Sequence, residues 1–231
     1  NGGTDLTEVN LAAADQAVDT PTNNFCVMNS AEKWYVQPTI SEGNCKVVDA
    51  SSGWAAAKGT MAVSTGKWYW EITITGTGGG KGMLMGFQEI NVQGQSAINP
   101  VNLAGTTAFY NTDGGEISII GTGTTTADYG QLDDGDILGI ALDMDAGSYG
   151  QVTFYDQNSA IASNIDISPT SDTVAPFVTV YNATNAINFG GCSAFTVSSA
   201  ASDENGYGNF EFAPPSGYLA LCTKNLGSDG G

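Results

Sequence analysis

The stretch GKWYWEITIT, residues 66–75, decides the fold of this chain. Its side chains alternate between two faces, and Trp68, Trp70, Ile72 and Ile74 share one of them. A period of two with aromatic and β-branched residues predicts a strand that is buried on one face and in water on the other. Because two inward tryptophans need a second layer to cover them, we expect a layered structure. The opposite face should be exposed: Lys67, Tyr69, Glu71, Thr73 and Thr75.

Other segments repeat this pattern along the chain. In residues 135–155, GDILGIALDMDAGSYGQVTFY, apolar side chains alternate up to a turn at residues 145–147 and resume after it. Turn residues recur about every ten positions, which is typical of a β-sandwich. Further strands are expected at residues 40–48 (with a turn at 42–44), 54–61, 83–87, 109–110, 117–120, 176–181, 186–189 and 219–223, with an edge strand within 210–218. The predicted core comprises Trp68, Trp70, Ile72, Leu138, Ile140, Leu142, Phe154 and Phe189.

Length and charge narrow the class of protein. A chain of 231 residues can bury one substantial core, and sandwiches of this size are commonly single domains. The 24 acidic and 6 basic side chains give a formal charge of −18, which repels nucleic acid and anionic lipid. The chain has no histidine, which removes Ser-His-Asp and Cys-His catalysis. We therefore expect neither a nucleic-acid partner nor insertion into a membrane.

The four cysteines leave two interpretations open. Cys26, Cys45, Cys192 and Cys222 are widely spaced and form no CxxC pair, which argues against a zinc site. They can be buried free thiols that pack as small hydrophobic groups. Alternatively, strands from the two ends of the chain lie side by side and bring cysteines into pairs, in which case a disulfide can form.

Two carboxylate patterns are candidate chemical sites. Glu71 is a possible catalytic carboxylate for glycoside hydrolysis, but it has no Glu-x-Asp-x-Glu companion, so we interpret it as a solvated residue on a strand. An acidic cluster has the short spacing that suits Ca²⁺ but lacks a complete calcium-binding loop. Its members are Asp133, Asp134, Asp136, Asp143 and Asp145. We predict no catalytic residue, no metal ligand and no cofactor, with calcium as the one alternative.

Aromatic and polar side chains near predicted turns are the candidate contacts to a ligand or partner. Aromatic rings at turns can stack on sugars or anchor a partner protein, and short polar groups can bond to hydroxyls. Core packing and turn chemistry explain the same residues equally well. The candidates are Tyr110, Asn111, Asp113, Tyr129, Tyr149 and Tyr181.

Five strings in order carry a resemblance to a known family. They are TPTNNFCVMN, GTMAVSTGKWYWEITIT, GDILGIALDMDAGSYGQVTFY, APFVTVYNATNAINFG and APPSGYLALCTKNL, spread over residues 20–226. Together they resemble the SPRY domains of structural proteins from tailed bacteriophages. The resemblance implies an all-β, concanavalin A-like sandwich of two antiparallel sheets with long loops at one end. It also implies a place on the virion and no enzymatic activity.

These expectations combine into one functional hypothesis. We expect an extended N-terminal arm at residues 1–19, the sandwich at residues 20–226 and a flexible tail at residues 227–231. The protein is predicted to be a non-enzymatic virion component of a tail, fibre or capsid decoration. Its partners would be other virion proteins or a glycan or protein of the host surface, and it would act as a homo-oligomer. The alternative is a glycan-binding lectin or a glycoside hydrolase on the same fold.

Overall fold

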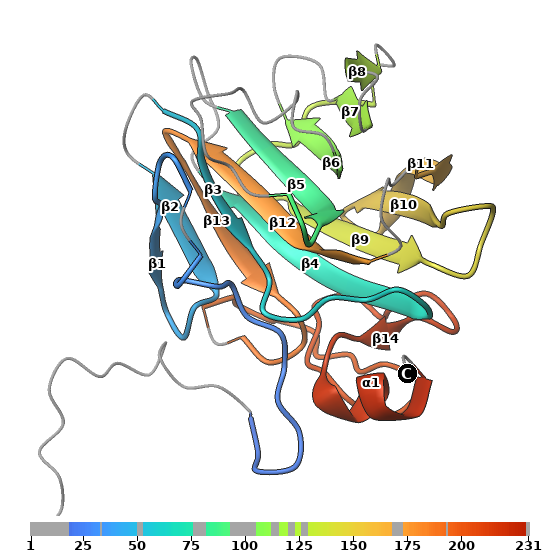
Figure 1. Ribbon diagram of the computed structural model, residues 1–231. Helices are drawn as coiled ribbons and strands as arrows, with labels where there is room; N and C mark the ends of the chain where they lie inside the picture. The colour runs from blue at the N-terminus through green and yellow to red at the C-terminus, as the bar shows by residue number, and fades with distance from the viewer. Residues whose placement is uncertain are drawn as a thin grey trace, which may run out of the picture.

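The structure, a computed structural model, is a sandwich of two antiparallel sheets, as predicted (Figure 1). It describes residues 19–32, 34–49, 53–75, 82–92, 105–111, 116–119, 123–125, 129–167, 173–192 and 194–229. Residues 1–18 of the predicted arm and residues 230–231 of the predicted tail lie outside these ranges.

The larger sheet has eight strands and is centred on the stretch that decides the fold. Its order is β1-β2-β13-β4-β9-β10-β11, and β14 pairs in parallel with β4 at the end that β13 leaves free. Strands far apart in sequence thus become neighbours. The bounds are β1 Thr39–Ser41, β2 Lys46–Asp49, β4 Lys67–Thr75, β9 Ile137–Asp143, β10 Gln151–Asp156, β11 Ser159–Asp166, β13 Ala183–Asn188 and β14 Leu219–Ala220.

The smaller sheet has six strands and packs against the first one. Its order is β3-β12-β5-β6-β7-β8. The bounds are β3 Ala55–Lys58, β5 Gly82–Glu89, β6 Thr106–Asn111, β7 Glu116–Ile119, β8 Gly123–Thr125 and β12 Val174–Tyr181. The sequence patterns predicted most of these strands but missed β8 and β11. The helix α1, Thr223–Asp229, was also missed, and it makes residues 227–229 helical where a flexible tail was expected.

The core between the sheets confirms the predicted inner face of β4. All eight predicted core residues are buried, with at most 1% of each exposed. The Trp70 ring lies 6.3 Å from the Phe189 ring, and Phe109 lies 5.9 Å from Phe154 across the sandwich. Close packing of this kind leaves little room for a change in side-chain volume.

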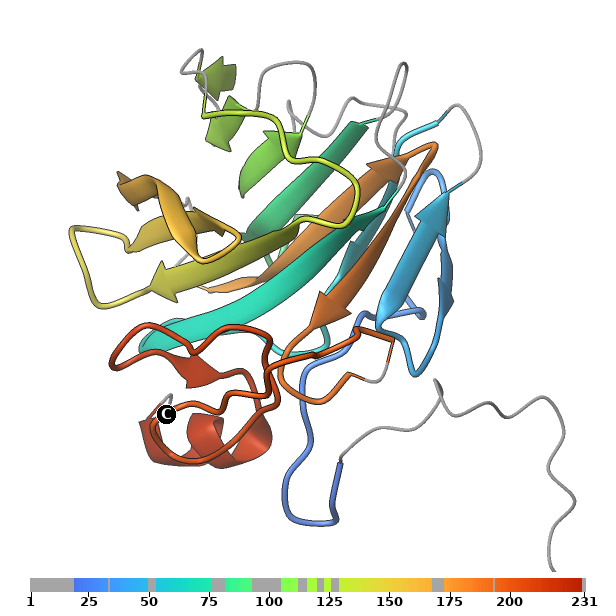
Figure 2. The same ribbon diagram turned by 180° about the vertical axis from the view of Figure 1, so that it is seen from behind.

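The outer face of β4 differs from the prediction. Lys67 is half-exposed, but Tyr69 and Glu71 are buried, at 2% and 0% exposure. The cause is the segment of residues 201–222. Apart from β14, which joins the sheet, this segment forms a third layer that crosses below β4 beside α1 (Figure 2). Residues 210–218, predicted as an edge strand, belong to this layer, and the Phe210 ring packs edge-on against Tyr69 at 5.3 Å. An alternating pattern identifies two faces but cannot say whether water or protein covers the second.

Replacing Trp70 by alanine should destabilise the fold severely, because it empties a buried volume between the sheets. We expect a loss of about 3–5 kcal/mol in the free energy of unfolding, sufficient to prevent folding of a marginally stable domain. Urea unfolding followed by fluorescence measures it. The exposed Tyr149→Ala variant is the control and should unfold at the wild-type urea concentration. A Trp70→Ala protein as stable as this control would contradict the core described above.

Candidate binding site

A trough of about 560 Å³ on the outer face of the eight-stranded sheet is the candidate binding site. It lies where the covering layer of residues 201–222 leaves the sheet open. Its floor comes from β2, β13, β4 and the start of β9, and one wall comes from the segment after β13. The lining residues are Lys46, Val48, Thr73, Thr75, Gly135, Ile137, Thr184, Ala186, Ala194 and Thr196.

Strand register explains why side chains do not fill the space above the floor of the trough. The outward side chains of three adjacent strands meet in two rows. Both rows consist mainly of small or β-branched residues, so the sheet face is not filled by its own side chains. One row is Thr75, Thr184 and Val48, and the other is Thr73, Ala186 and Lys46. The next outward residue of β4 is Glu71, which the third layer buries.

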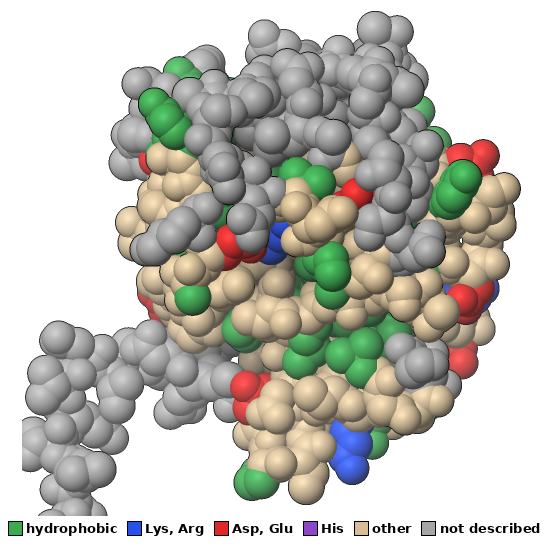
Figure 3. Space-filling view, viewed as in Figure 1, with side chains coloured by type: hydrophobic (Ala, Val, Ile, Leu, Met, Phe, Trp, Pro, Cys, Tyr) green, Lys and Arg blue, Asp and Glu red, His purple; other side chains and the backbone are tan. Residues whose placement is uncertain are grey.

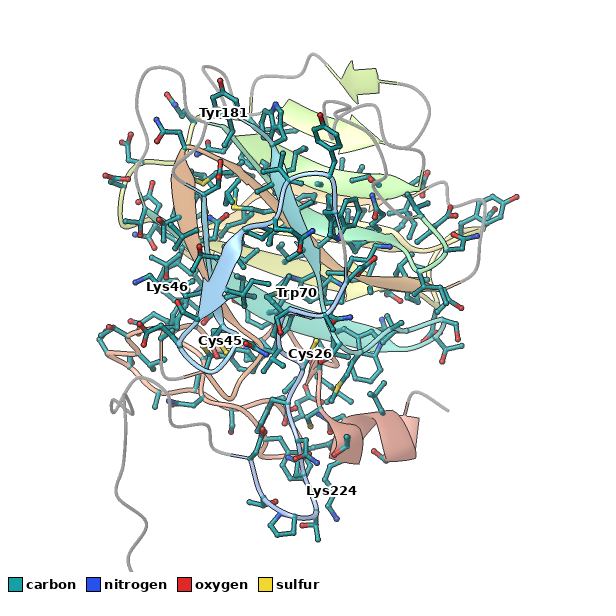
Figure 4. The ribbon with its side chains drawn as sticks, turned by 60° about the vertical axis from the view of Figure 1, so that its left-hand side comes forward. Cys26, Cys45, Lys46, Trp70, Tyr181 and Lys224 are labelled. Atoms are coloured by element: carbon teal, nitrogen blue, oxygen red, sulfur yellow. The ribbon has the colours of Figure 1, made fainter. Side chains whose placement is uncertain are left out.

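Lys46 is the only charged residue among the ten that line the trough. Among the described residues, ion pairs form from Lys58 to Glu32 and from Lys67 to Asp143, and none forms at Lys46. Lys46 extends from β2 at the outer face (Figure 4). The trough therefore offers threonine hydroxyl groups and one unpaired ammonium group to a ligand.

The predicted contact residues do not form one site. Tyr181 ends β12 and packs against Trp54 at 5.4 Å. Tyr181 pairs with Gly82 of β5, and Asn111 pairs with Met83, the next residue of that strand. Tyr181 therefore lies at the same end of the six-stranded sheet as Tyr110 and Asn111. Half-buried Tyr129 packs against the core, and Leu132, three residues on, bonds to Asn111.

The remaining candidates differ in position. Tyr149 is 54% exposed but lies in the turn between β9 and β10, at the opposite end of the sandwich. Asn111 is buried, and the oxygen and nitrogen of its amide are hydrogen-bonded to the backbone of Leu132, at 3.0 and 3.1 Å. Its side chain therefore stabilises the fold and is not free to contact a ligand. Asp113 and the side chain of Tyr110 lie outside the described residues. Sequence reasoning missed the trough because its floor joins strands that are not consecutive.

Glu71 was expected in water but lies at a buried polar centre. Each carboxylate oxygen accepts two hydrogen bonds. Oε2 accepts from the Glu211 N–H at 2.9 Å and the Asn188 amide at 3.3 Å. Oε1 accepts from the Phe212 N–H at 2.8 Å and the Tyr69 hydroxyl at 3.2 Å. A carboxylate sealed in this way cannot touch a sugar, so the geometry removes the candidate catalytic residue of the hydrolase hypothesis.

Burial controls the protonation of Glu71. Loss of solvation raises the pKa of this carboxyl above its ordinary value of 4.5, and the two backbone N–H groups, the tyrosine hydroxyl and the amide oppose the shift. Because the folded-state pKa is the higher one, the folded protein binds this proton more tightly than the unfolded chain. The contribution to stability is therefore full below pH 4.5 and is lost as the pH rises through the folded-state pKa.

The Glu71→Gln variant tests this centre. The glutamine NH₂ group must face a backbone N–H, so we expect a loss of about 1–3 kcal/mol in the free energy of unfolding. Chemical denaturation from pH 4 upwards should show the wild-type advantage shrinking as pH rises. Glu204→Gln is the control with the opposite sign, since the Ser216 hydroxyl and the Gly217 N–H lower the pKa of that exposed carboxyl. An advantage of wild type over Glu71→Gln that grows with pH would contradict the assignment.

The five-aspartate cluster proposed for calcium is not one cluster. Asp133, Asp134 and Asp136 precede β9, whereas Asp143 is its last residue and Asp145 follows it, so an extended strand separates the two groups. Asp136 caps its own turn at the Asp133 N–H, and Asp145 accepts from the Gly66 N–H at 3.0 Å. No group of three potential metal-ligating side chains occurs within the described ranges. The absence of a cofactor stays a prediction.

All four cysteines are free and buried. The two ends of the described chain do lie side by side, since Phe25 pairs with Cys222 and the Cys26 N–H donates a hydrogen bond to the Leu221 carbonyl. No helix in the described ranges is long and apolar enough to span a bilayer.

Comparisons with known proteins place this geometry in a family. The sequence model of the family described as "SPRY domain" matches residues 67–192. The PSpry domain of TRIM65 is similar in structure, with a TM-score of 0.55 at 12% identity, covering 71% of this chain and 89% of that one. The SPRY domain of human HERC1 matches with a TM-score of 0.49 at 16% identity, covering 73% and 95%. A search of curated proteins found no match.

Proposed function

The chain belongs to the SPRY domain family, and we propose that it is a non-enzymatic module whose trough binds a segment of a partner protein. SPRY domains are protein–protein interaction modules. The observation that carries the proposal is the open sheet face with one unpaired lysine and otherwise neutral, small side chains.

The lining favours a polypeptide over a sugar. Sugar rings are commonly held by stacking on aromatic side chains, and none of the ten lining residues is aromatic. Threonine hydroxyls can donate to and accept from the amide groups of an extended segment. Small side chains of such a segment fit over Thr73, Thr184 and Ala186. This supports a peptide ligand and weakens the lectin alternative at this site.

Lys46 selects one side chain of the partner. An acidic residue placed over Lys46 would form a charge-assisted hydrogen bond. The rest of the surface opposes an acidic partner, because the chain carries a charge of −18 and its acidic side chains are dispersed on the face shown in Figure 3. We therefore infer a segment with one acidic residue in a neutral or basic context.

The setting is a further proposal. The order and spacing of the GKWYWE and GDILGIALD strings support a place on a tailed-phage virion, as a tail, fibre or capsid component. The family match and the two similar structures lend this setting no support of their own. On a particle, several copies would raise avidity for other virion proteins or for a host-surface partner in host attachment. The homo-oligomer belongs to the same proposal.

Peptide selection tests the binding site. A random-peptide display library selected on the wild-type protein should yield segments with an enriched acidic position. Lys46→Gln should weaken the selected peptides about three- to tenfold, as expected for an exposed charge contact that keeps its neutral neighbours. Isothermal titration measures the affinity.

Two further variants test whether the trough is the binding site. Lys224→Gln is the matched control, because Lys224 is exposed on α1 at the bottom of the view in Figure 4, away from Lys46, and it should leave the affinity unchanged. Thr184→Trp fills the trough and should abolish binding. Selected peptides that bind Thr184→Trp as well as wild type would show that the trough is not the site.

A further inference from the structure

Two cysteines flank the floor and the wall of the trough. Cys45 directly precedes Lys46 of the floor, and Cys192 lies two residues before Ala194 of the wall. The Ile187 N–H donates to the Cys45 carbonyl at 2.7 Å, which extends the pairing of β13 with β2 by one residue. The chain then reverses at Gly190, whose φ of 105° suits glycine, and returns Cys192 towards the start of β2. Figure 4 shows Cys45 just below Lys46.

The two thiols are neighbours inside the protein. Each thiol lies close enough to shift the pKa of the other, and Cys45 and Cys192 are only 4% and 9% exposed. The neighbouring Cys45 thiol lowers the pKa of Cys192, helped by the Ala194 and Phe195 N–H groups and opposed by burial. The Cys192 thiol raises the pKa of Cys45, which burial raises further.

We propose that Cys45 and Cys192 form a reversible disulfide that controls access to the trough; the control of binding rests on the proposed function, whereas the disulfide does not. The oxidant is a low-molecular-weight disulfide such as oxidised glutathione. The Cys192 thiolate attacks one of its sulfurs, forming a mixed disulfide and releasing one thiol. The Cys45 thiol then loses its proton and attacks the Cys192 sulfur, releasing the second thiol. The protein loses two hydrogens, and the oxidant is reduced to two thiols.

The bond changes the shape of the site. Two unlinked sulfurs become a covalent pair at about 2.05 Å. The wall, which begins two residues after Cys192, is drawn towards the floor at Lys46. A narrower trough accommodates an extended segment less well. Oxidation should therefore weaken the selected peptides at least about threefold, a change of about 0.7 kcal/mol at RT of about 0.59 kcal/mol.

The first experiment maps the disulfide without a partner. The protein is incubated with oxidised glutathione, alkylated under denaturing conditions and digested without reduction. We expect one cross-linked pair of peptides, containing Cys45 and Cys192, and a loss of two of the four free thiols. Cys45→Ser should stop at a mixed disulfide with glutathione on Cys192, and Cys222→Ser should form the same cross-link as wild type. A cross-link through Cys26, or four free thiols after treatment, would overturn the proposal.

The second experiment tests the coupling to the trough. Hydrogen–deuterium exchange should slow in the peptide that contains Ala194 and Thr196 when the disulfide forms. The affinity of peptides selected on the reduced protein should fall in the oxidised protein and recover with a thiol reductant. The Cys45→Ser/Cys192→Ser variant is the control and should show neither change. A mapped disulfide with unchanged exchange at the wall would overturn control of the trough, even if no peptide ligand is ever found.

Discussion

The carboxylate of Glu71 is the interaction on which the architecture of this protein depends. It lies on the outer face of the central strand and accepts hydrogen bonds from the backbone N–H groups of Glu211 and Phe212, which only a substitution by proline would remove. A buried carboxylate is costly unless its oxygens are satisfied, and here four donors satisfy them. The sheet therefore depends on the third layer to satisfy Glu71, and Glu71 in turn fixes the third layer to the sheet.

Asp203 repeats this principle within the third layer. It is buried and accepts hydrogen bonds from the Tyr207 and Ala220 N–H groups and the Asn225 amide. It thus ties the segment before Phe210 to β14 and α1. Glu71 anchors the layer to the sheet, and Asp203 holds the layer together. The trough exists because the third layer ends at Glu71 and does not cover Thr73 and Thr75.

The inner face of the sandwich could be predicted from sequence, and the outer face could not. Alternation from Trp68 to Ile74 identifies a buried face because only packing explains two tryptophans in register. The same alternation gives Tyr69, Glu71 and Thr73 one pattern, although protein covers the first two and the third lines the trough. The difference lies in residues 201–222, whose contact with β4 spans more than a hundred positions of the chain.

The candidate site was missed for a related reason. Lys46, Thr73 and Thr184 become neighbours only because β13 inserts between β2 and β4, a pairing that no local pattern encodes. The tyrosines chosen from turns were scattered because turns occur at both ends of a sandwich. The spacing of the cysteines was compatible both with free thiols and with disulfide pairs. In the fold, Cys45 lies near Cys192, and both are free thiols.

The position of β14 and the third layer has a consequence for biosynthesis. A ribosome delivers β4 long before residues 201–222, so the outer face of the nascent sheet holds Glu71 and Tyr69 with their eventual partners still untranslated. Contacts of such high sequence separation form slowly and late. Until they form, the emerging chain exposes the Glu71 carboxyl group and the Tyr69 ring, both of which the folded protein buries. Translation of the third layer is therefore the step that commits the domain to its final form.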